Sequence, residues 1–127
     1  MKKILNTDKA PAPVGPYNQS ILTGNTLYIS GQIAIDPASG NLLTEDIETE
    51  THQVMKNLAA VLDNAEMDFS HVVKCSVFVS DMDNYARINA VYGSYFDEAT
   101  APARELVQVS VLPKHVNVEV SAVAYNG

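Results

Sequence analysis

Alternation of apolar and polar residues, the pattern of a half-buried β-strand, occurs in both halves of the chain. Residues 26–30 predict a strand that continues past Gly31 to Ile35. Because glycine weakens the interior of a strand, Gly31 indicates a bulge, or a position that a ligand or another backbone approaches closely. Residues 36–40, which include a proline, a serine and a glycine, predict the turn that ends this strand.

Two segments have the period of an α-helix instead. In residues 46–65 one helix face is apolar, and acidic residues crowd the first turns, where the helix dipole favours negative charge. Residues 83–96 predict a second helix, with Asp83 as its N-cap. The apolar face of this helix consists of Tyr85, Ile88, Tyr92 and Phe96.

The remaining alternating segments predict three more strands. In residues 72–79, one face carries Val73, Cys75, Val77 and Val79, and the other carries Lys74, Ser76 and Phe78. Residues 106–111 and 117–125 also alternate, and the short loop 112–115 joins them. Two strands joined in this way predict a β-hairpin at the end of the chain.

The order of these elements is strands, helix, strand, helix, strands. It predicts an α+β sandwich in which both helices pack on one face of the sheet, and we expect residues 1–127 to form a single domain. The other sheet face is left partly apolar, because Tyr28, Phe78 and Leu106 are expected to point to it. An uncovered apolar face is typical of a self-associating protein, so we expect an oligomer.

The composition sets the broad class of the protein. Of its 127 residues, 46% are hydrophobic and 18% are charged, the balance of a globular protein rather than a disordered one. No apolar run approaches the roughly 18 residues of a membrane span, and no apolar stretch typical of a secretory signal follows Lys2 and Lys3. The single cysteine, Cys75, excludes an internal disulfide, so we expect a reducing, cytoplasmic setting.

The charge of the chain argues against nucleic acid as a partner. The formal net charge is −7, and the eight Lys and Arg residues are scattered without a basic run. Non-specific binding of DNA or RNA depends on neutralising phosphates with such residues. The sequence leaves open only a local basic pocket.

Familiar catalytic motifs are missing from the sequence. His52, His71 and His115 are too far apart for the HxH or HExxH spacing of zinc ligands, so we expect no metal site. There is no G-x-S-x-G elbow, Walker loop or G-x-G-x-x-G turn. Cys75 lies on the apolar face of a strand, where a cysteine is more typical of the core than of a nucleophile.

Four polar residues remain as candidates for a functional site. Arg104 follows a proline at the start of a strand, where its guanidinium could be a rigid fork for a carboxylate or only a surface ion pair. Glu119 could position a water molecule or be solvated. Tyr17 follows residues 10–16, a proline-rich segment that is either a loose arm or a rigid ledge. Asn89 lies in mid-helix, where asparagine is disfavoured, so it indicates a hydrogen-bonding role.

The chain resembles the RidA (YjgF/UK114) family over essentially its whole length. Residues 12–19 (APVGPYNQ) are similar to the family's A-P-x-x-G-P-Y-x-Q opening, and residues 28–33 (YISGQI) to its (V/I)-x-x-S-G-Q-(I/L) strand. The later family motifs are matched, in order, by residues 79–85, by Asn89, Tyr92 and Phe96, and by residues 102–104, 112–114 and 118–120.

This resemblance implies a chorismate-mutase-like α+β fold. It also implies a homotrimer whose sheets face inward as a barrel, with three clefts between subunits. The implied activity is that of a 2-iminobutanoate/2-iminopropanoate deaminase, which hydrolyses reactive imines and their 2-aminoacrylate-type enamine tautomers without a metal or organic cofactor. Such intermediates leak from pyridoxal-phosphate enzymes and damage them.

The resemblance also implies roles for individual residues. Arg104 is implied to grip the substrate carboxylate, and Glu119 to hold or activate the attacking water. Tyr17, Ser30 and Gly31 are implied to line the cleft. The backbone of Leu106 is implied to help orient the substrate, and Asn89 to be supporting structure.

Three positions depart from the family pattern. Glu105 stands where many members have Ser or Thr, Leu106 where many have Cys, and Val111 where Arg is common. Strand alternation predicts that Glu105 points away from the face of Arg104. Leu106 keeps the backbone amide but lacks the thiol, so we expect carboxylate binding to survive, while substrate preference is open.

Two other functions stay open from the sequence. One is a non-catalytic module that binds small carboxylates such as 2-keto acids through Arg104. The other is an endoribonuclease or translation inhibitor, a label that some members of the family carry. The acidic charge and the lack of a histidine cluster argue against the second.

Overall fold

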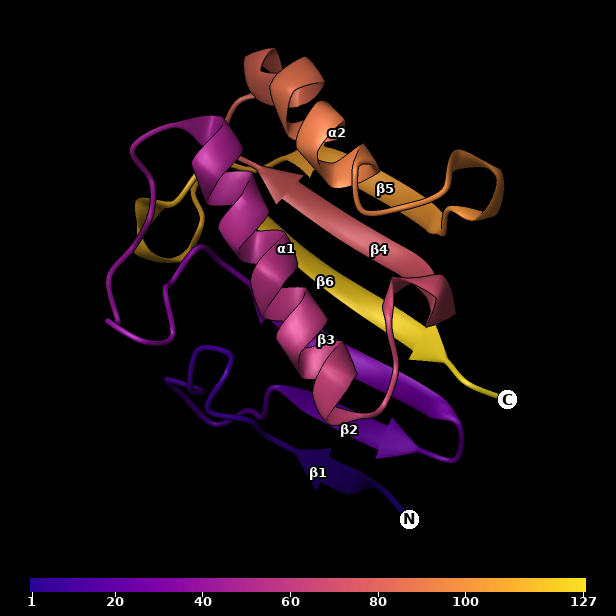
Figure 1. Ribbon diagram of the computed structural model, residues 1–127. Coiled ribbons are helices and arrows are strands. Elements are labelled where there is room, and N and C mark those ends of the chain that lie inside the picture. The colour runs from indigo at the N-terminus through magenta and orange to yellow at the C-terminus, as the bar shows by residue number, and fades with distance from the viewer.

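One mixed, six-stranded sheet forms the centre of the computed structural model, which describes residues 1–127 (Figure 1). Helices α1 (Ile47–Asn64) and α2 (Tyr85–Gly93) lie side by side on one face of this sheet. The predicted α+β architecture is therefore confirmed. The strands are β1 (Lys3–Leu5), β2 (Ser20–Thr23), β3 (Thr26–Gln32), β4 (Val72–Val79), β5 (Ala103–Gln108) and β6 (Val118–Tyr125).

The last two strands do not form the predicted hairpin. The strand order is β1-β2-β3-β6-β4-β5, so β6 lies between β3 and β4 and is antiparallel to both. Strand β5 instead runs parallel to β4 at the sheet edge, after a crossover through α2. A parallel pair requires such a crossover. The hairpin prediction was wrong because alternation identifies a strand but not its neighbours.

Two bulges decide which side chains reach which face. The register of β3 against β6 shifts between Ile29 and Gln32, which confirms the irregularity predicted at Gly31. A second shift, between Val72 and Lys74 in β4, turns Val73 outward. Val73 is 49% exposed and does not share the buried face of Cys75, contrary to the sequence pattern. An extra residue in a bulge reverses the alternation locally, and no glycine marks this one.

Aspartates cap α1 and the short 3₁₀ turn that precedes α2. Asp46 caps α1, because its carboxylate accepts a hydrogen bond from the Thr49 amide at 2.7 Å. Before the second helix, the capping aspartate is Asp81 rather than Asp83. Asp81 accepts from the Asp83 amide at 2.9 Å and begins a short 3₁₀ turn, Met82–Asn84, that precedes α2. The N-cap of α2 itself is Asn84, whose side chain makes no capping hydrogen bond, so the predicted cap at Asp83 was wrong.

The hydrophobic core fills the space between the helices and the sheet. The side of β6 that faces the helices is fully apolar and buried, and it comprises Val118, Val120, Ala122 and Ala124.

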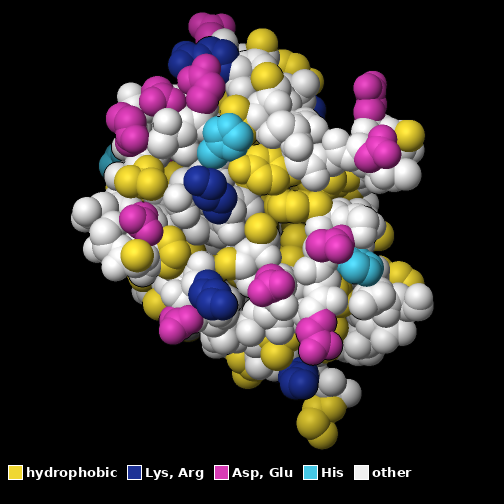
Figure 2. Space-filling view, viewed as in Figure 1, with side chains coloured by type: hydrophobic (Ala, Val, Ile, Leu, Met, Phe, Trp, Pro, Cys, Tyr) yellow, Lys and Arg dark blue, Asp and Glu magenta, His cyan; other side chains and the backbone are white.

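Figure 2 shows the helix side of the molecule, where Lys and Arg side chains stand apart from one another. Neither helix is long and apolar enough to cross a membrane.

The opposite sheet face is partly apolar and has no covering layer. Tyr28 is 50% exposed there, and Phe78 lies on the same side, as predicted. Leu106 does not. It pairs with the buried Val77 and packs against the core on the helix side, and its neighbour Val107 takes the open face. Because positions 106 and 107 are both apolar, the period of two could not assign them.

Candidate functional site

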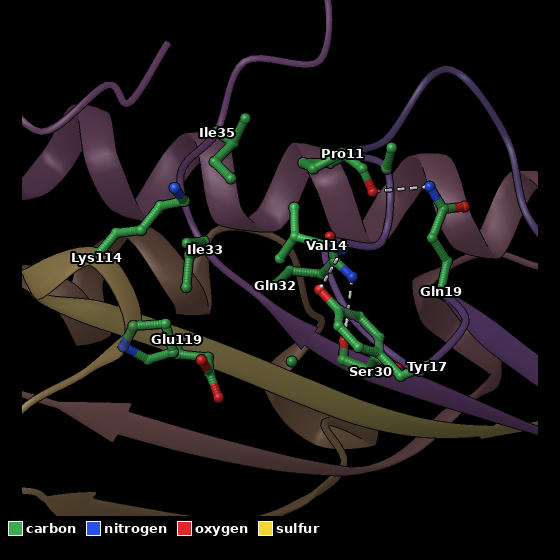
Figure 3. Close-up of a pocket in the computed structure, with 13 residues that line it drawn as sticks. Pro11, Val14, Tyr17, Gln19, Ser30, Gln32, Ile33, Ile35, Lys114 and Glu119 are labelled. Atoms are coloured by element: carbon green, nitrogen blue, oxygen red, sulfur yellow. Dashed lines mark hydrogen bonds between the residues drawn. The ribbon is translucent and has the colours of Figure 1, made fainter. Parts of the chain in front are cut away.

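A cavity of about 450 Å³ opens between the N-terminal arm and the ends of β3 and β6 (Figure 3). Its walls are largely apolar, with Val14, Ile33 and Ile35 among them. Four of the residues implied by sequence lie on it, namely Tyr17, Ser30, Gly31 and Glu119. We call these four residues the Glu119 half-site.

The proline-rich arm above this cavity is fastened by Gln19, which is 2% exposed. The side-chain amide of Gln19 donates to the carbonyls of Thr7 and Pro11 at 2.9 Å each, and its oxygen accepts from the Thr7 amide at 2.7 Å. The Tyr17 hydroxyl accepts a hydrogen bond from the Val14 amide at 3.3 Å, so the ring lies against the arm. Of the two sequence interpretations, these bonds support the rigid ledge.

Gly31 makes room for the Glu119 carboxylate. A Cβ atom at Gly31 would lie 2.6 Å from Glu119 Oε2, closer than real Cβ contacts, so the close approach predicted at Gly31 is confirmed. Beside it, the Ser30 hydroxyl donates to the Asn18 carbonyl at 2.6 Å and ties β3 to the arm. Glycine at position 31 is thus required by a side chain on the neighbouring strand.

Glu119 is the carboxylate of this cavity. It lies on the open side of β6, and partial burial raises the pKa of its carboxyl above the ordinary range. A raised pKa makes a carboxylate a stronger base once it is ionised. The protonated form also persists to higher pH, so the base form is lost as the pH falls through this raised pKa.

Arg104 is held in a second hollow of about 460 Å³, against α2. One terminal nitrogen donates to Asn89 Oδ1 at 2.8 Å, and the other donates to the Tyr85 hydroxyl at 3.2 Å. The guanidinium carbon also stands 4.9 Å from the centre of the Tyr92 ring, a cation–π distance. We call these four residues the Arg104 half-site. They fix the plane of the fork and leave its other N–H groups free for a ligand.

One chain does not bring the two half-sites together. Arg104 faces α2 on the helix side, whereas Glu119 points to the open side of the sheet, and neither of the two cavities described above contains both. Leu106 lines neither cavity. Asn89 does contact Arg104, as its predicted supporting role requires. The predicted residues therefore fall into two separate groups, and Leu106 belongs to neither.

Sequence reasoning missed several residues in or beside these half-sites. Lys114 lines the cavity of Glu119, and its ammonium points to the rim near Ile35 (Figure 3). It occupies a left-handed backbone conformation that sequence rarely signals outside Gly, Asn and Asp. Tyr85 and Tyr92 were identified only as apolar helix positions, and their contacts with Arg104 depend on β5 lying beside α2.

Cys75 is part of the core, as the strand pattern predicted. Its thiol is buried in the hydrophobic cluster beneath the helices. Burial raises the pKa of the Cys75 thiol, which keeps it in the unreactive, protonated form.

The fold and the two half-sites define a class: small α+β proteins with an anchored arginine and a partly buried carboxylate in two separate cavities. The family model described as Endoribonuclease L-PSP matches residues 7–126. The chain therefore belongs to this family, which includes the YjgF and RidA proteins.

Three relatives show how the family is named. A RutC family protein from Synechocystis is 51% identical over 96% of this chain and 95% of its own length. The 2-iminobutanoate/2-iminopropanoate deaminase of mouse is 41% identical over 100% of this chain and 92% of its own. The crystal structure of Escherichia coli TdcF with bound serine has a TM-score of 0.93 at 35% identity, covering 98% of this chain and 99% of that one.

Proposed function

We propose that this protein hydrolyses reactive 2-imino acids to 2-keto acids and ammonia. The proposed substrates are 2-iminobutanoate and 2-iminopropanoate, together with 2-aminoacrylate, the enamine tautomer of 2-iminopropanoate. The observation that carries the proposal is that one chain presents both a guanidinium whose plane is fixed and, in a separate open cavity, a desolvated carboxylate. The mouse relative bears the name of this activity, and TdcF was solved with serine, a small carboxylate.

The complete site is proposed to form between copies of the chain in a homotrimer. Each copy has an open, partly apolar sheet face that includes Tyr28, Phe78 and Val107. Burying such faces against one another is favourable, and closed symmetry would repeat the same contact around the ring. In this arrangement the Arg104 half-site of one copy meets the Glu119 half-site of the next.

Arg104 would bind and orient the substrate. A guanidinium and a carboxylate form two parallel hydrogen bonds, which fix the plane of the substrate as well as its position. Asn89, Tyr85 and Tyr92 already restrict the guanidinium, so little conformational freedom is lost when the substrate binds. The imine carbon next to the carboxylate is then held at a set distance from the opposite cavity wall.

Glu119 would hold the attacking water. As a base it removes a proton while the water oxygen bonds to the imine carbon and the nitrogen gains a proton. The resulting carbinolamine then loses ammonia, with the C–N bond breaking as the C=O bond forms. One water is consumed and one ammonia released for each keto acid. These steps need only orientation and proton transfer.

The reduced, buried Cys75 suits the cytoplasm, where we place this activity.

The coupled imine assay tests the proposal. Threonine or serine dehydratase generates the imine while semicarbazide competes for it, and semicarbazone formation is recorded. We expect the wild type to suppress semicarbazone and Arg104→Ala to lose this effect. Arg87→Ala is the matched control, since Arg87 makes its own bidentate pair with Glu48 on the exposed helix surface. It should behave as the wild type.

Failure of the wild type in this assay would favour the non-catalytic carboxylate module. Calorimetry with 2-ketobutyrate would then detect binding that depends on Arg104 but survives loss of Glu119. RNA cleavage, which the family description suggests, is disfavoured by the net charge of −7 and the scattered basic residues. A salt-dependent RNA-binding titration separates this function from the other two.

A further inference from the structure

A buried glutamate outside both half-sites has no function in the reaction as described. Glu50, in the first turns of α1, is 0% exposed, and none of the ion pairs of the chain includes it. Its carboxylate accepts three hydrogen bonds, from the Asn117 amide at 2.7 Å, the Asn117 side chain at 2.8 Å and the Val118 amide at 3.1 Å. An acidic group in a core is costly, so its retention calls for a local reason.

The donors to Glu50 lie at the start of β6, immediately before Glu119. Asn117 is also tied to the end of β4, because its carbonyl accepts from the Ser80 amide at 3.1 Å and its side-chain oxygen from the Ser80 hydroxyl at 3.2 Å. Glu50 thus joins α1 to the point where β6 enters the sheet (Figure 1). Side chains alternate along β6, so Val118 points to the helix side and Glu119 to the open side. Fixing the Val118 amide therefore also fixes the position from which the Glu119 side chain projects.

The loop that leads into this point is strained. Lys114 and His115 have φ angles of 55° and 56°, two consecutive left-handed residues without a glycine. Such a conformation persists only where surrounding contacts hold it. The loop also supplies Pro113 and Lys114 to the wall of the Glu119 cavity. Its C-terminal end is held by the hydrogen bonds from Asn117 and Val118 to Glu50.

A carboxylate suits this task because both of its oxygens only accept hydrogen bonds. An apolar residue of the same size would fill the space but leave three N–H groups without partners. Glutamine could replace it in one way only. Its oxygen would accept from the two backbone amides, and the Asn117 amide would flip to accept from the new NH₂ group.

We propose that Glu50 is a positioning residue, which fixes the strained 113–118 segment from the helix side so that Glu119 and Lys114 face the cavity in one orientation. The inference rests on the proposed function, in which Glu119 holds the attacking water. Glu50 itself does not touch the substrate. It acts through the backbone amides next to Glu119.

Steady-state imine hydrolysis by four variants tests this role. Glu50→Ala, measured where the protein is folded, should lower kcat at least about tenfold and leave KM within about twofold, because Arg104 and substrate binding are untouched. Glu50→Gln should stay within about twofold of wild-type kcat, since a flipped Asn117 amide restores the bonds. Asn117→Ala, which keeps the backbone bonds, should fall between them. Glu48→Ala, an exposed acidic position of the same helix, is the control and should match the wild type.

A folded Glu50→Ala with wild-type kcat would overturn the inference and leave Glu50 a stability residue only. Where Glu50→Ala does not fold, unchanged kcat in Asn117→Ala overturns it instead. Amide hydrogen exchange of residues 113–120 keeps the result separate from the proposed function. If exchange is faster than in the wild type in Glu50→Ala but not in Glu50→Gln, the anchoring role of Glu50 is supported even if the wild type hydrolyses no imine. Equal exchange in the two variants refutes that role.

Discussion

The two half-sites differ in how the chain builds them. The Arg104 half-site is made of side chains on regular elements, with Tyr85, Asn89 and Tyr92 spaced along one helix and Arg104 on the strand beside it. The Glu119 half-site depends on irregular backbone instead. It needs a bulge at Gly31, an arm fastened by buried hydrogen bonds, and a loop with left-handed residues.

This difference suggests a division of work. A helix and a strand that pack on a common core hold an arginine rigidly, which suits recognition of an invariant carboxylate. Loops and bulges vary more easily without loss of the core, which suits a wall that meets the variable part of a substrate. We therefore expect changes in the Arg104 half-site to act on binding of every substrate. Changes that displace Glu119, which is proposed to hold the attacking water, should act on turnover instead.

The largest expected effect tests whether the two half-sites belong to different copies. Arg104→Ala and Glu119→Gln should each be nearly inactive, with Glu119→Gln lowering kcat about 10²–10⁴-fold. Subunits refolded together in equal amounts should regain about a quarter of wild-type activity, the fraction of interfaces that pair an intact Arg104 with an intact Glu119. The measurement is imine hydrolysis before and after mixing.

A mixture of Glu119→Gln with Gly31→Ala serves as the control for this experiment. Both changes damage the same half-site, so mixing them leaves no interface intact and should restore nothing. Absence of recovery in the Arg104→Ala and Glu119→Gln mixture, with trimers formed, would mean that each site lies within one chain.

The sequence predicted where the elements of the fold lie along the chain better than it predicted which elements lie next to one another. Strand 72–79 and the start of the first helix were located to within a residue, because alternation and helical period depend on burial on one side. The position of β6 between β3 and β4 could not be predicted, since a local pattern does not record which strand lies alongside. Leu106 and Val73 were assigned to the wrong face for related reasons: one has an apolar neighbour, and the other lies in a bulge.

The residues of the site were predictable to different degrees. Arg104, Glu119 and Asn89 stand out as polar residues in patterned segments, and the resemblance to a family named them. Their distribution over two cavities is a property of the tertiary structure, since it depends on β5 pairing with β4 beneath α2. Glu50 was interpreted as one of several helix-start acids, because nothing local distinguishes it from its exposed neighbour Glu48. Only its burial and its three donors do so.

A methyl group at position 31 should damage the Glu119 half-site alone. In Gly31→Ala the new Cβ would stand 2.6 Å from Glu119 Oε2, so the carboxylate must move. We expect a loss of about 1–3 kcal/mol in the free energy of unfolding, as for other overpacked positions, and a fall in kcat of at least tenfold. In a Glu119→Ala background the same change should cost almost no stability, because the clash is gone. Equal costs in both backgrounds, measured by urea unfolding, would place the strain elsewhere.

The smallest expected effect separates binding from turnover at the Arg104 half-site. Tyr85→Phe removes the hydrogen bond that the guanidinium donates at 3.2 Å, but keeps the ring and the bond that the guanidinium donates to Asn89. A bond to a charged group at a half-exposed position is worth a factor of about three to ten, which should appear as a higher KM at unchanged kcat.

Two further readouts make this last comparison specific. Tyr95→Phe is the matched control, since it loses a hydroxyl contact to His52 at 2.9 Å and not one to Arg104, and its KM should not change. The acid limb of the kcat profile, which the raised pKa of Glu119 sets, should stay in place in Tyr85→Phe because Glu119 keeps its burial. A variant that instead lowers kcat or shifts that limb would show that the guanidinium also acts on the attacking water, and the division between the half-sites would not hold.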